Sequence, residues 1–348
     1  MSGSKIAAID TRMYKEARSA SAIVENQLRE NSSLVQRIGE LLRDRKPQVV
    51  LTCARGSSDH AATYGKYLIE TFAGIPTASF APSVSSIYSA KQNMQGAIFL
   101  ALSQSGASPD LLVSAKAARQ AGALVIALVN VVDSPLAELA DEVVPLHAGA
   151  ETSVAATKSY IATLTALAQL VAAWTRNDKL VDALTELPAQ LAEAKDLDWQ
   201  AAVDALTEAR NFFVIGRGLG LGIAQEAALK FKETAGLHAE SYSAAEVRHG
   251  PMAIVDAGFP VLLFTQDDAT RTGVDAVVQD FSARDAVVLV AGKSYDCAVN
   301  LPSVEGVYAA TAPIVLIQSF YIMVNALAVA RGYDPDSPPH LRKVTETL

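Results

Sequence analysis

The chain has 348 residues, of which half are hydrophobic, and it carries a net charge of −8 at pH 7. This length is enough for two α/β domains, and an acidic chain without a lysine- or arginine-rich face is not expected to bind nucleic acid. The cysteines, Cys53 and Cys297, stand far apart and predict neither a disulfide framework nor a metal cluster. The charged amino-terminal segment lacks the apolar core of a secretory signal, so we expect a cytoplasmic protein.

Strand candidates alternate with helical stretches along the first half of the chain. Strands are predicted at 48–53, 77–80, 97–102, 125–129 and 142–145, and helices at 61–72, 111–121 and 135–140. This alternation predicts a mostly parallel, doubly wound sheet. An uncharged helix at 161–174 closes this half, and a polar helical stretch at 178–198 connects it to the next.

The second half repeats this succession of elements. A strand at 212–215 leads through a glycine-rich turn into a helix at 223–235, and strands at 261–265 and 287–291 precede a helix at 311–330. The uncharged run at 307–330 is long enough to cross a membrane, but it contains Pro313, Gln318, Ser319 and Asn325 and has an apolar counterpart in the first half. We therefore predict a buried core helix and no membrane association.

The segment that follows the predicted strand 97–102 is rich in neutral hydrogen-bond donors. It holds Ser103, Gln104, Ser105 and Ser108 directly before a predicted helix. Such a turn gathers backbone N–H groups at the positive end of a helix dipole, which favours an anion. It has no lysine and no Gly-Lys-Ser/Thr ending, so it is not a nucleotide P-loop. We predict a phosphate site here, with a simple helix cap as the alternative role of Ser108.

The corresponding turns of the second half differ. The sequence Gln266-Asp267-Asp268 follows the strand 261–265, and its carboxylates would repel a phosphate, so we expect one phosphate site per chain. The glycines between 216 and 222 do not occupy the first, third and sixth places of the dinucleotide fingerprint. We interpret them as a tight turn between strand and helix.

Candidate acid–base residues lie on the helix predicted at 223–235. Glu226, Lys230 and Glu233 are spaced i, i+4 and i+7 and therefore share one face, which alone is also typical of a surface ion pair. His249 stands before a Gly-Pro turn, where its ring can reach a ligand. A carboxylate, a lysine and a histidine near a phosphate site suit proton transfer next to a carbonyl.

Together these motifs resemble the sugar isomerase (SIS) superfamily, and more narrowly the isomerase half of glucosamine-6-phosphate synthase and the stand-alone isomerase-type glucosamine-6-phosphate deaminases. The motifs lie at 55–58, 102–106, 151–158, 226–233, 238–240 and 248–251 and in the Pro-Pro-His-Leu-Arg-Lys tail at 338–343. The resemblance implies an α/β fold of two tandem SIS domains, each a mostly parallel, doubly wound sheet flanked by helices. We expect them at 20–177 and 195–333, with a tail at 334–348 over the active site.

The resemblance also implies a role for individual residues. The sugar phosphate would be held by Ser57, Ser103, Gln104, Ser105 and Ser108, and the backbone of Val154 would touch the sugar. Glu233 would move the proton between sugar carbons 1 and 2, with Lys230 beside it. His249 would assist ring opening from a neighbouring subunit, and Lys343 would lie near the open-chain carbonyl. The family pattern thus implies a homodimer with shared active sites and a small-molecule sugar phosphate as ligand, with no metal or other cofactor.

Three departures from the synthase pattern bear on the substrate. The chain has Arg55-Gly56-Ser57-Ser58 in place of Cys-Gly-Thr-Ser, Ala107-Ser108 in place of Glu-Thr, and Ala156 in place of a serine. No cysteine stands at position 2, and we expect no glutaminase domain ahead of residues 1–19. We therefore expect breakdown of an amino sugar phosphate: glucosamine 6-phosphate is isomerised and hydrolysed to fructose 6-phosphate and ammonia.

Other functions remain open at this point. A fructosamine-phosphate deglycase or a galactosamine-phosphate deaminase/isomerase would share these residues and differ in the shape of the pocket. A non-catalytic sugar-phosphate sensor would need the serine-rich turn, but it has no use for the set Lys230, Glu233, His249 and Lys343. The presence of the whole set favours an enzyme.

Overall fold

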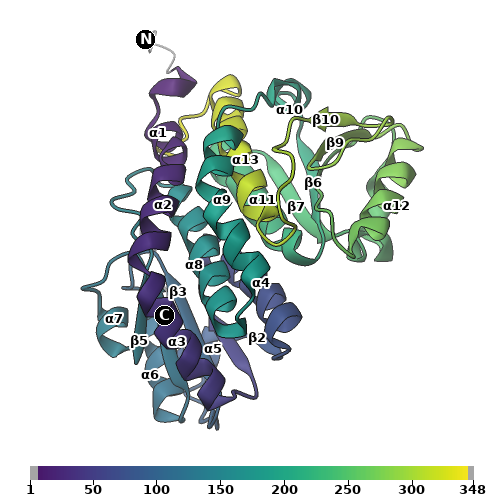
Figure 1. Cartoon of the computed structure of the whole chain (residues 1–348). Helices are drawn as coiled ribbons and strands as arrows, with labels where there is room; N and C mark the ends of the chain where they lie inside the picture. Colours follow the sequence, from purple (N-terminus) through teal and green to yellow (C-terminus); the bar gives the residue numbers. More distant parts are fainter. Residues whose placement is uncertain (1–6, 344–348) are drawn as a thin grey trace. The chain divides into compact units, whose positions relative to one another are not determined.

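The computed structural model describes residues 7–343, which form two compact units interleaved along the chain (Figure 1). Unit 1 consists of the described part of Met1–Ser21 with Glu151–Lys158 and Glu186–Lys343, and unit 2 consists of Ala22–Ala150 and Ser159–Thr185. Each unit is built on one five-stranded sheet.

The sheet of unit 2 is entirely parallel. Its strands are β1 (Val50–Cys53), β2 (Thr77–Ser79), β3 (Ile98–Ser103), β4 (Leu124–Val129) and β5 (Glu142–Pro145), in the order β2-β1-β3-β4-β5. All residues of β3 and β4 are buried, as expected for central strands that helices cover on both faces. The five strands predicted for the first half are confirmed, with bounds that differ by at most two residues.

Helices pack against this sheet through small and aliphatic side chains. They are α2 (Ala20–Glu30), α3 (Ser32–Arg45), α4 (Ser57–Leu68) with a π-helical turn at Ile69–Ala73, α5 (Pro82–Ser86), α6 (Pro109–Gln120), α7 (Pro135–Leu139) and α8 (Lys158–Thr175). Leu111 and Ala115 of α6 share a buried cluster with Phe99 of β3 and Val125 of β4. Alternate residues of a strand face opposite sides of the sheet. Ile98 and its i+2 neighbours in β3 are therefore directed to the face opposite to α6.

The sheet of unit 1 repeats the same topology. Its parallel strands are β6 (Asn211–Gly216), β7 (His238–Ser243), β8 (Pro260–Phe264), β9 (Val287–Ala291) and β10 (Val299–Leu301), in the order β7-β6-β8-β9-β10. In each sheet the first strand of the repeat lies between the second and the third. The predicted repeat of two doubly wound halves is therefore confirmed.

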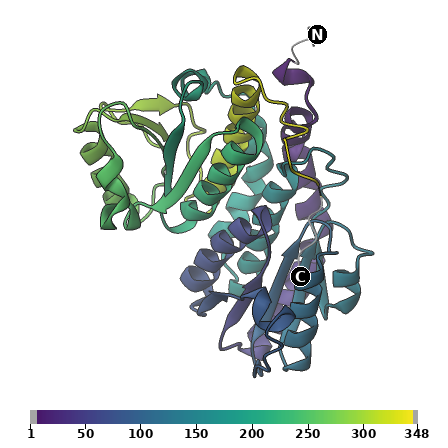
Figure 2. The same cartoon turned by 180° about the vertical axis from the view of Figure 1, so that it is seen from behind.

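The helices of unit 1 cover both faces of its sheet (Figures 1 and 2). They are α1 (Arg12–Arg18), α9 (Asp178–Ala194, which begins in unit 2), α10 (Gln200–Leu206), α11 (Leu221–Ala235), α12 (Arg271–Ser282) and α13 (Ala312–Ala330), with short 3-10 turns at Ala8–Asp10, Gly218–Gly220, Glu246–His249 and Pro251–Ile254. Val277 and Phe281 of α12 pack on one face. On the other face the ring of Phe231 in α11 contacts Phe212 of β6 and Phe320 of α13, with centroid distances of 4.5 and 5.1 Å.

Helix α13 is the apolar segment that could be mistaken for a membrane span. It is the one helix among the described residues that is long and apolar enough to cross a membrane, and 78% of its most apolar window is buried inside the protein. Two of its polar residues have partners within unit 1: Ser319 donates to the carbonyl of Ala194, and Asn325 donates to the carbonyl of Ala8. The side-chain amide of Gln318 is buried in the same helix without a hydrogen-bond partner among the described residues. The prediction of a core helix is confirmed.

The glycines between β6 and α11 form a tight turn, as the sequence predicts. A Cβ atom on Gly216 would lie 2.2 Å from the carbonyl oxygen of Gly220, and Gly218 has a φ of +58°. Gly216 is required because a Cβ atom would clash with the backbone, and Gly218 is favoured because its φ is positive. Nucleotide binding is not needed to explain either glycine.

Candidate functional site

The serine-rich turn of unit 2 lies between the end of β3 and the start of α6. The backbone N–H of Gly106 donates to Ser103 Oγ at 3.0 Å, which folds the turn back on the end of the strand. Gly106 has a φ of +63°, and a Cβ atom there would lie 2.0 Å from Ser134 Oγ. The tight turn thus requires glycine, and its backbone leads directly into the amino terminus of α6.

Three side chains of this turn keep polar atoms at the surface. Ser103 is nearly buried, whereas Gln104, Ser105 and Ser108 are half-buried. Ser108 is the N-cap residue of α6, but its hydroxyl makes no capping hydrogen bond, so the alternative role as a simple cap is not what the structure shows. The arrangement can accept an anion through hydroxyls, an amide and the helix N-terminus.

Ser57 belongs to the same edge of the sheet. It is the first residue of α4, which follows β1, and β1 pairs in parallel with β3. The carboxyl ends of neighbouring parallel strands meet at one edge, so the amino termini of α4 and α6 open toward the same region. This is the edge at which open α/β sheets bind their ligands.

One ion pair at this edge was not predicted from the sequence. The guanidinium of Arg55 contacts Oδ2 of Asp110 through Nη2 at 2.6 Å and Nε at 2.8 Å. Asp110 is fully buried in the first turn of α6, where its negative charge would oppose a bound phosphate. Arg55 therefore supplies the charge that balances this carboxylate, at a position where the synthase pattern has a cysteine.

The candidate acid–base residues of unit 1 form a buried ion triad on α11. Lys230 Nζ lies 3.3 Å from Glu226 Oε1 and 2.5 Å from Glu233 Oε2. Glu226 also accepts a hydrogen bond of 3.0 Å from the hydroxyl of Tyr321 in α13. The side chains of Glu226 and Lys230 are at most 1% exposed, so the alternative of a solvated surface pair is wrong.

The two carboxylates of this triad have different access to a ligand. Glu226 is fully buried, whereas the side chain of Glu233 is 22% exposed. Burial alone would lower the pKa of Lys230, but the charges of Glu226 and Glu233 more than offset this, so the pKa of Lys230 lies above its ordinary value. Lys230 is therefore held as a positive charge, and Glu233 is the member of the triad whose side chain is partly exposed.

His249 and Glu233 lie near opposite ends of strand β7 in the unit 1 sheet. His249 ends the 3-10 turn Glu246–His249, which follows the carboxyl end of β7, and its side chain is exposed before Gly250, whose φ is +136°. Glu233 instead precedes the amino end of β7. A strand of six residues spans about 16 Å at the usual rise per residue. The structure thus does not bring His249 and Glu233 of one chain together.

The loop 151–158 and the tail meet within unit 1. Lys343 Nζ lies 3.4 Å from Oε2 of Glu151, which is buried, and Oε1 of Glu151 accepts the backbone N–H of Thr157 at 2.9 Å. Val154 is half-buried in this loop. The structure therefore brings Lys343 to the loop that carries Val154. The last part of the predicted tail, 344–348, lies outside the described residues.

The predicted site residues thus belong to two sets. The phosphate set, Ser57, Ser103, Gln104, Ser105 and Ser108, belongs to unit 2. The catalytic set, Lys230, Glu233, His249 and Lys343, belongs to unit 1, as does Val154, the expected backbone contact to the sugar. Between residues 7 and 343, no group of three or more His, Cys, Asp or Glu side chains is placed to hold a metal ion.

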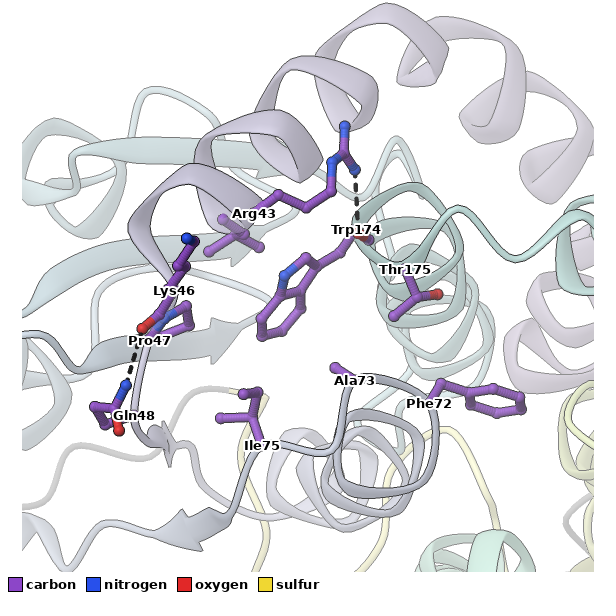
Figure 3. Close-up of a pocket in the computed structure, with 10 residues that line it drawn as sticks. Arg43, Lys46, Pro47, Gln48, Phe72, Ala73, Ile75, Trp174 and Thr175 are labelled. Atoms are coloured by element: carbon purple, nitrogen blue, oxygen red, sulfur yellow. Dashed lines mark hydrogen bonds between the residues drawn. The ribbon is translucent and has the colours of Figure 1, made fainter.

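Unit 2 also has a hollow that is distinct from the phosphate edge (Figure 3). Residues 46–48 and Ile75, which line it, precede the amino ends of β1 and β2, opposite to the edge with the serine-rich turn. The guanidinium of Arg43 is engaged there by the carbonyl oxygens of Ala173 and Trp174, at 2.6 and 3.1 Å. We interpret the hollow as a feature of helix packing.

Comparison with proteins of known structure agrees with the fold. A proposed phosphosugar isomerase from Silicibacter pomeroyi DSS-3 is 44% identical in sequence and superimposes with a TM-score of 0.90, covering 94% of this chain and all of that one. The C-terminal domain of glucosamine-fructose-6-phosphate aminotransferase from Francisella tularensis is 24% identical, with a TM-score of 0.85 over 94% of this chain and 98% of that one.

Curated relatives are glutamine–fructose-6-phosphate aminotransferases (isomerizing). That of Methanothermobacter thermautotrophicus is 34% identical over 96% of this chain, and that of Thermococcus kodakarensis is 31% identical over 95%. The chain spans 57% of the length of each of these relatives. A family model, the SIS domain, matches residues 41–173 and again residues 205–331. This chain therefore belongs to the SIS domain family.

Proposed function

We propose that the protein is a glucosamine-6-phosphate deaminase/isomerase of the cytoplasm. The observation that carries this proposal is the buried triad on α11, in which Lys230 stays charged between two carboxylates and Glu233 alone is open to a ligand. Related proteins named for isomerising sugar phosphates support the choice of substrate class.

The proposed reaction uses these groups in sequence. The serine-rich turn holds the phosphate of the open-chain sugar, and Glu233 takes the proton from carbon 2. The enolamine that results carries negative charge toward its carbon 1 oxygen, which the fixed charge of Lys230 or Lys343 stabilises. Glu233 returns the proton to carbon 1, and a proton from the nitrogen passes to the carbon 1 oxygen, which leaves a hydroxymethyl group at carbon 1 and a ketimine at carbon 2. Water adds to the ketimine, and ammonia leaves as fructose 6-phosphate forms.

A catalytic role explains the burial of the triad better than a role in sensing. Removing the Glu226 carboxylate and the Lys230 ammonium from water costs several kcal/mol per ion, which their mutual attraction repays only in good geometry. A protein that merely binds a sugar phosphate at the serine-rich turn gains nothing from this arrangement. An enzyme gains a base and a fixed positive charge held in one place.

We further propose that the active site is completed by a second subunit. The support lies in unit 1, where His249 and Glu233 are at opposite ends of the same sheet. This placement supports a site in which one sugar receives Glu233 from one chain and His249 from another. A homodimer in which His249 reaches the partner's site satisfies both roles.

Product analysis with a panel of substrates tests this function. Purified protein is incubated with glucosamine 6-phosphate, galactosamine 6-phosphate and a fructosamine 6-phosphate, and both ammonia and the ketose phosphate are measured. We expect ammonia and fructose 6-phosphate in equal amounts from glucosamine 6-phosphate, at the highest kcat/KM of the panel. Preference for another member would replace the proposed substrate, and turnover of none would remove the enzyme assignment in favour of a sensor.

A further inference from the structure

Helix α1 contacts two segments of unit 1 that the proposed function uses. One is the loop 151–158, which carries Val154, and the other is the tail that follows α13 and ends in Lys343. Figures 1 and 2 show α1, in purple, beside the yellow tail. Neither the phosphate set nor the triad includes a residue of α1, so the reaction as proposed does not explain these contacts.

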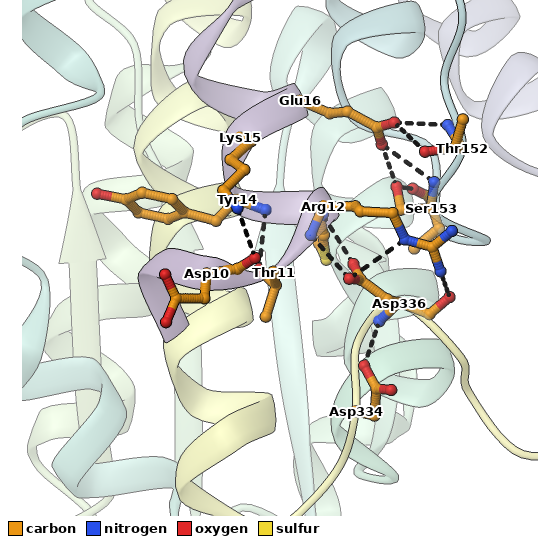
Figure 4. Close-up of polar contacts among 12 residues, drawn as sticks. Asp10, Thr11, Arg12, Tyr14, Lys15, Glu16, Thr152, Ser153, Asp334 and Asp336 are labelled. Atoms are coloured by element: carbon orange, nitrogen blue, oxygen red, sulfur yellow. Dashed lines mark hydrogen bonds and ion pairs between the residues drawn. The ribbon is translucent and has the colours of Figure 1, made fainter. Parts of the chain in front are cut away.

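The carboxylate of Glu16 binds the loop through four donors (Figure 4). Its Oε1 accepts the backbone N–H of Thr152 at 2.5 Å and the Thr152 hydroxyl at 3.0 Å. Its Oε2 accepts the backbone N–H of Ser153 at 3.2 Å and also the Ser153 hydroxyl. Hydrogen bonds to an ionised acceptor are roughly twice as strong as neutral ones. Glu16 therefore fixes the backbone immediately before Val154.

The other end of α1 is bound to the tail. Asp336 Oδ2 accepts the backbone N–H of Arg12 at 2.7 Å, and Oδ1 accepts that of Met13 at 2.8 Å. The first N–H groups of a helix have no partner within it, so this carboxylate satisfies two of them. The hydroxyl of Thr11 donates to Asn325 Oδ1 of α13 at 2.7 Å, which holds the start of α1 on the core helix.

These contacts form a closed ring. The tail runs from Asp336 to Lys343, and Lys343 pairs with Glu151. Glu151 precedes Thr152, which is bound by Glu16, and α1 leads from Glu16 back to the residues held by Asp336. The position of the Lys343 ammonium therefore depends on the same helix that shapes the loop.

We propose that α1 is a positioning helix for the active site and that Glu16 is its principal positioning residue. The Glu16 carboxylate sets the loop that presents Val154 and Glu151, and through Glu151 it sets the ammonium of Lys343. The inference rests on the proposed function for the roles of Val154 and Lys343, whereas the contacts themselves do not. Such placement matters because an error of about 1 Å costs on the order of 100-fold in rate.

Glu16→Gln is the variant that tests this role. The amide keeps the size of the side chain, but it has one acceptor oxygen and directs an NH2 group at two of the loop's donors. Glu16→Asp keeps the carboxylate and shortens its reach, so it is expected to retain more function. Asp10→Asn is the matched control, because Asp10 is exposed and its carboxylate makes no hydrogen bond within the described structure.

Hydrogen–deuterium exchange reads the position of the loop and the tail without any substrate. We expect at least about tenfold faster exchange in peptides 150–157 and 334–343 of Glu16→Gln, with unchanged exchange in α11 and α13 and no change in Asp10→Asn. Unchanged exchange in the loop and tail would overturn the proposal. Faster exchange throughout unit 1 would also overturn it, since Glu16 would then be a general stabilising residue.

Kinetics connect this movement to the reaction. With glucosamine 6-phosphate, kcat of Glu16→Gln is expected to fall by roughly 10- to 100-fold, while inhibition by inorganic phosphate stays within twofold because the phosphate set belongs to unit 2. Combined with Lys343→Ala, Glu16→Gln should slow the reaction little further, since both act through one ammonium. Independent, multiplicative losses would contradict the ring. A wild-type protein that turns over no sugar phosphate would refute the proposed function, and the exchange experiment would still decide the role of α1.

Discussion

At the scale of single residues, the phosphate prediction depends on the neutrality of the serine-rich turn. Ser105 is half-buried in this turn, ahead of the amino terminus of α6. A carboxylate introduced by Ser105→Asp would occupy and repel the phosphate position. We expect Ser105→Asp to abolish binding of a sugar phosphate in calorimetry, with an unchanged circular dichroism spectrum. Ser294→Asp, at an exposed serine of unit 1, is the control, and wild-type affinity in Ser105→Asp would remove the phosphate assignment.

The sequence predicted which residues are candidates for the site, but it did not predict which other residues they contact. The i, i+4, i+7 spacing placed Glu226, Lys230 and Glu233 on one face, but only the packing of α11 against α13 shows that the face is buried. The pair Arg55–Asp110 joins residues 55 positions apart, and no local pattern indicates it. An ion pair between residues far apart in the sequence forms only in the folded chain. The spacing of residues in the sequence therefore predicts neither the Arg55–Asp110 pair nor the neutralisation of the Asp110 charge by Arg55.

At the scale of elements, the buried strands were predictable and the edge strands of unit 1 were not. Strands β3 and β4 are continuous apolar runs because both faces are covered. By contrast β7, with the sequence HAESYS, is mostly exposed or half-buried, and β10 has three residues. Each of these two strands has one neighbour and lacks a continuous apolar run, so hydropathy alone does not reveal them.

At the scale of the whole molecule, the repeat was predictable and the interleaving of the units was not. Each half shows the same succession of strands and helices, and both sheets have the same order. The amino-terminal helix and the loop 151–158 nevertheless belong to the unit of the second half. Contacts such as that of Glu16 with Thr152 hold these segments in unit 1, and they link positions 136 residues apart in the sequence.

The proposed sharing of sites between subunits is also a property of the whole molecule. Glu233→Gln and His249→Ala are each expected to be inactive, because each lacks one group of every site. A mixed dimer would contain one site with both groups intact, so mixing the two variants should restore activity, to about a quarter of the wild-type value at full exchange of subunits. Subunit exchange is verified with two different tags. No recovery despite proven exchange would place Glu233 and His249 in one chain's site or remove one of them from it.

Glu233 is proposed to move a proton between carbons 1 and 2 of an amino sugar phosphate. Wild-type protein, Glu233→Gln and the exposed control Glu208→Gln are incubated with glucosamine 6-phosphate in D2O, and proton NMR follows loss of the carbon 2 proton and deuterium at carbon 1 of the product. We expect exchange in the wild type and in Glu208→Gln, and a loss of roughly 100- to 10,000-fold in Glu233→Gln. Exchange at the wild-type rate in Glu233→Gln would contradict this role of Glu233.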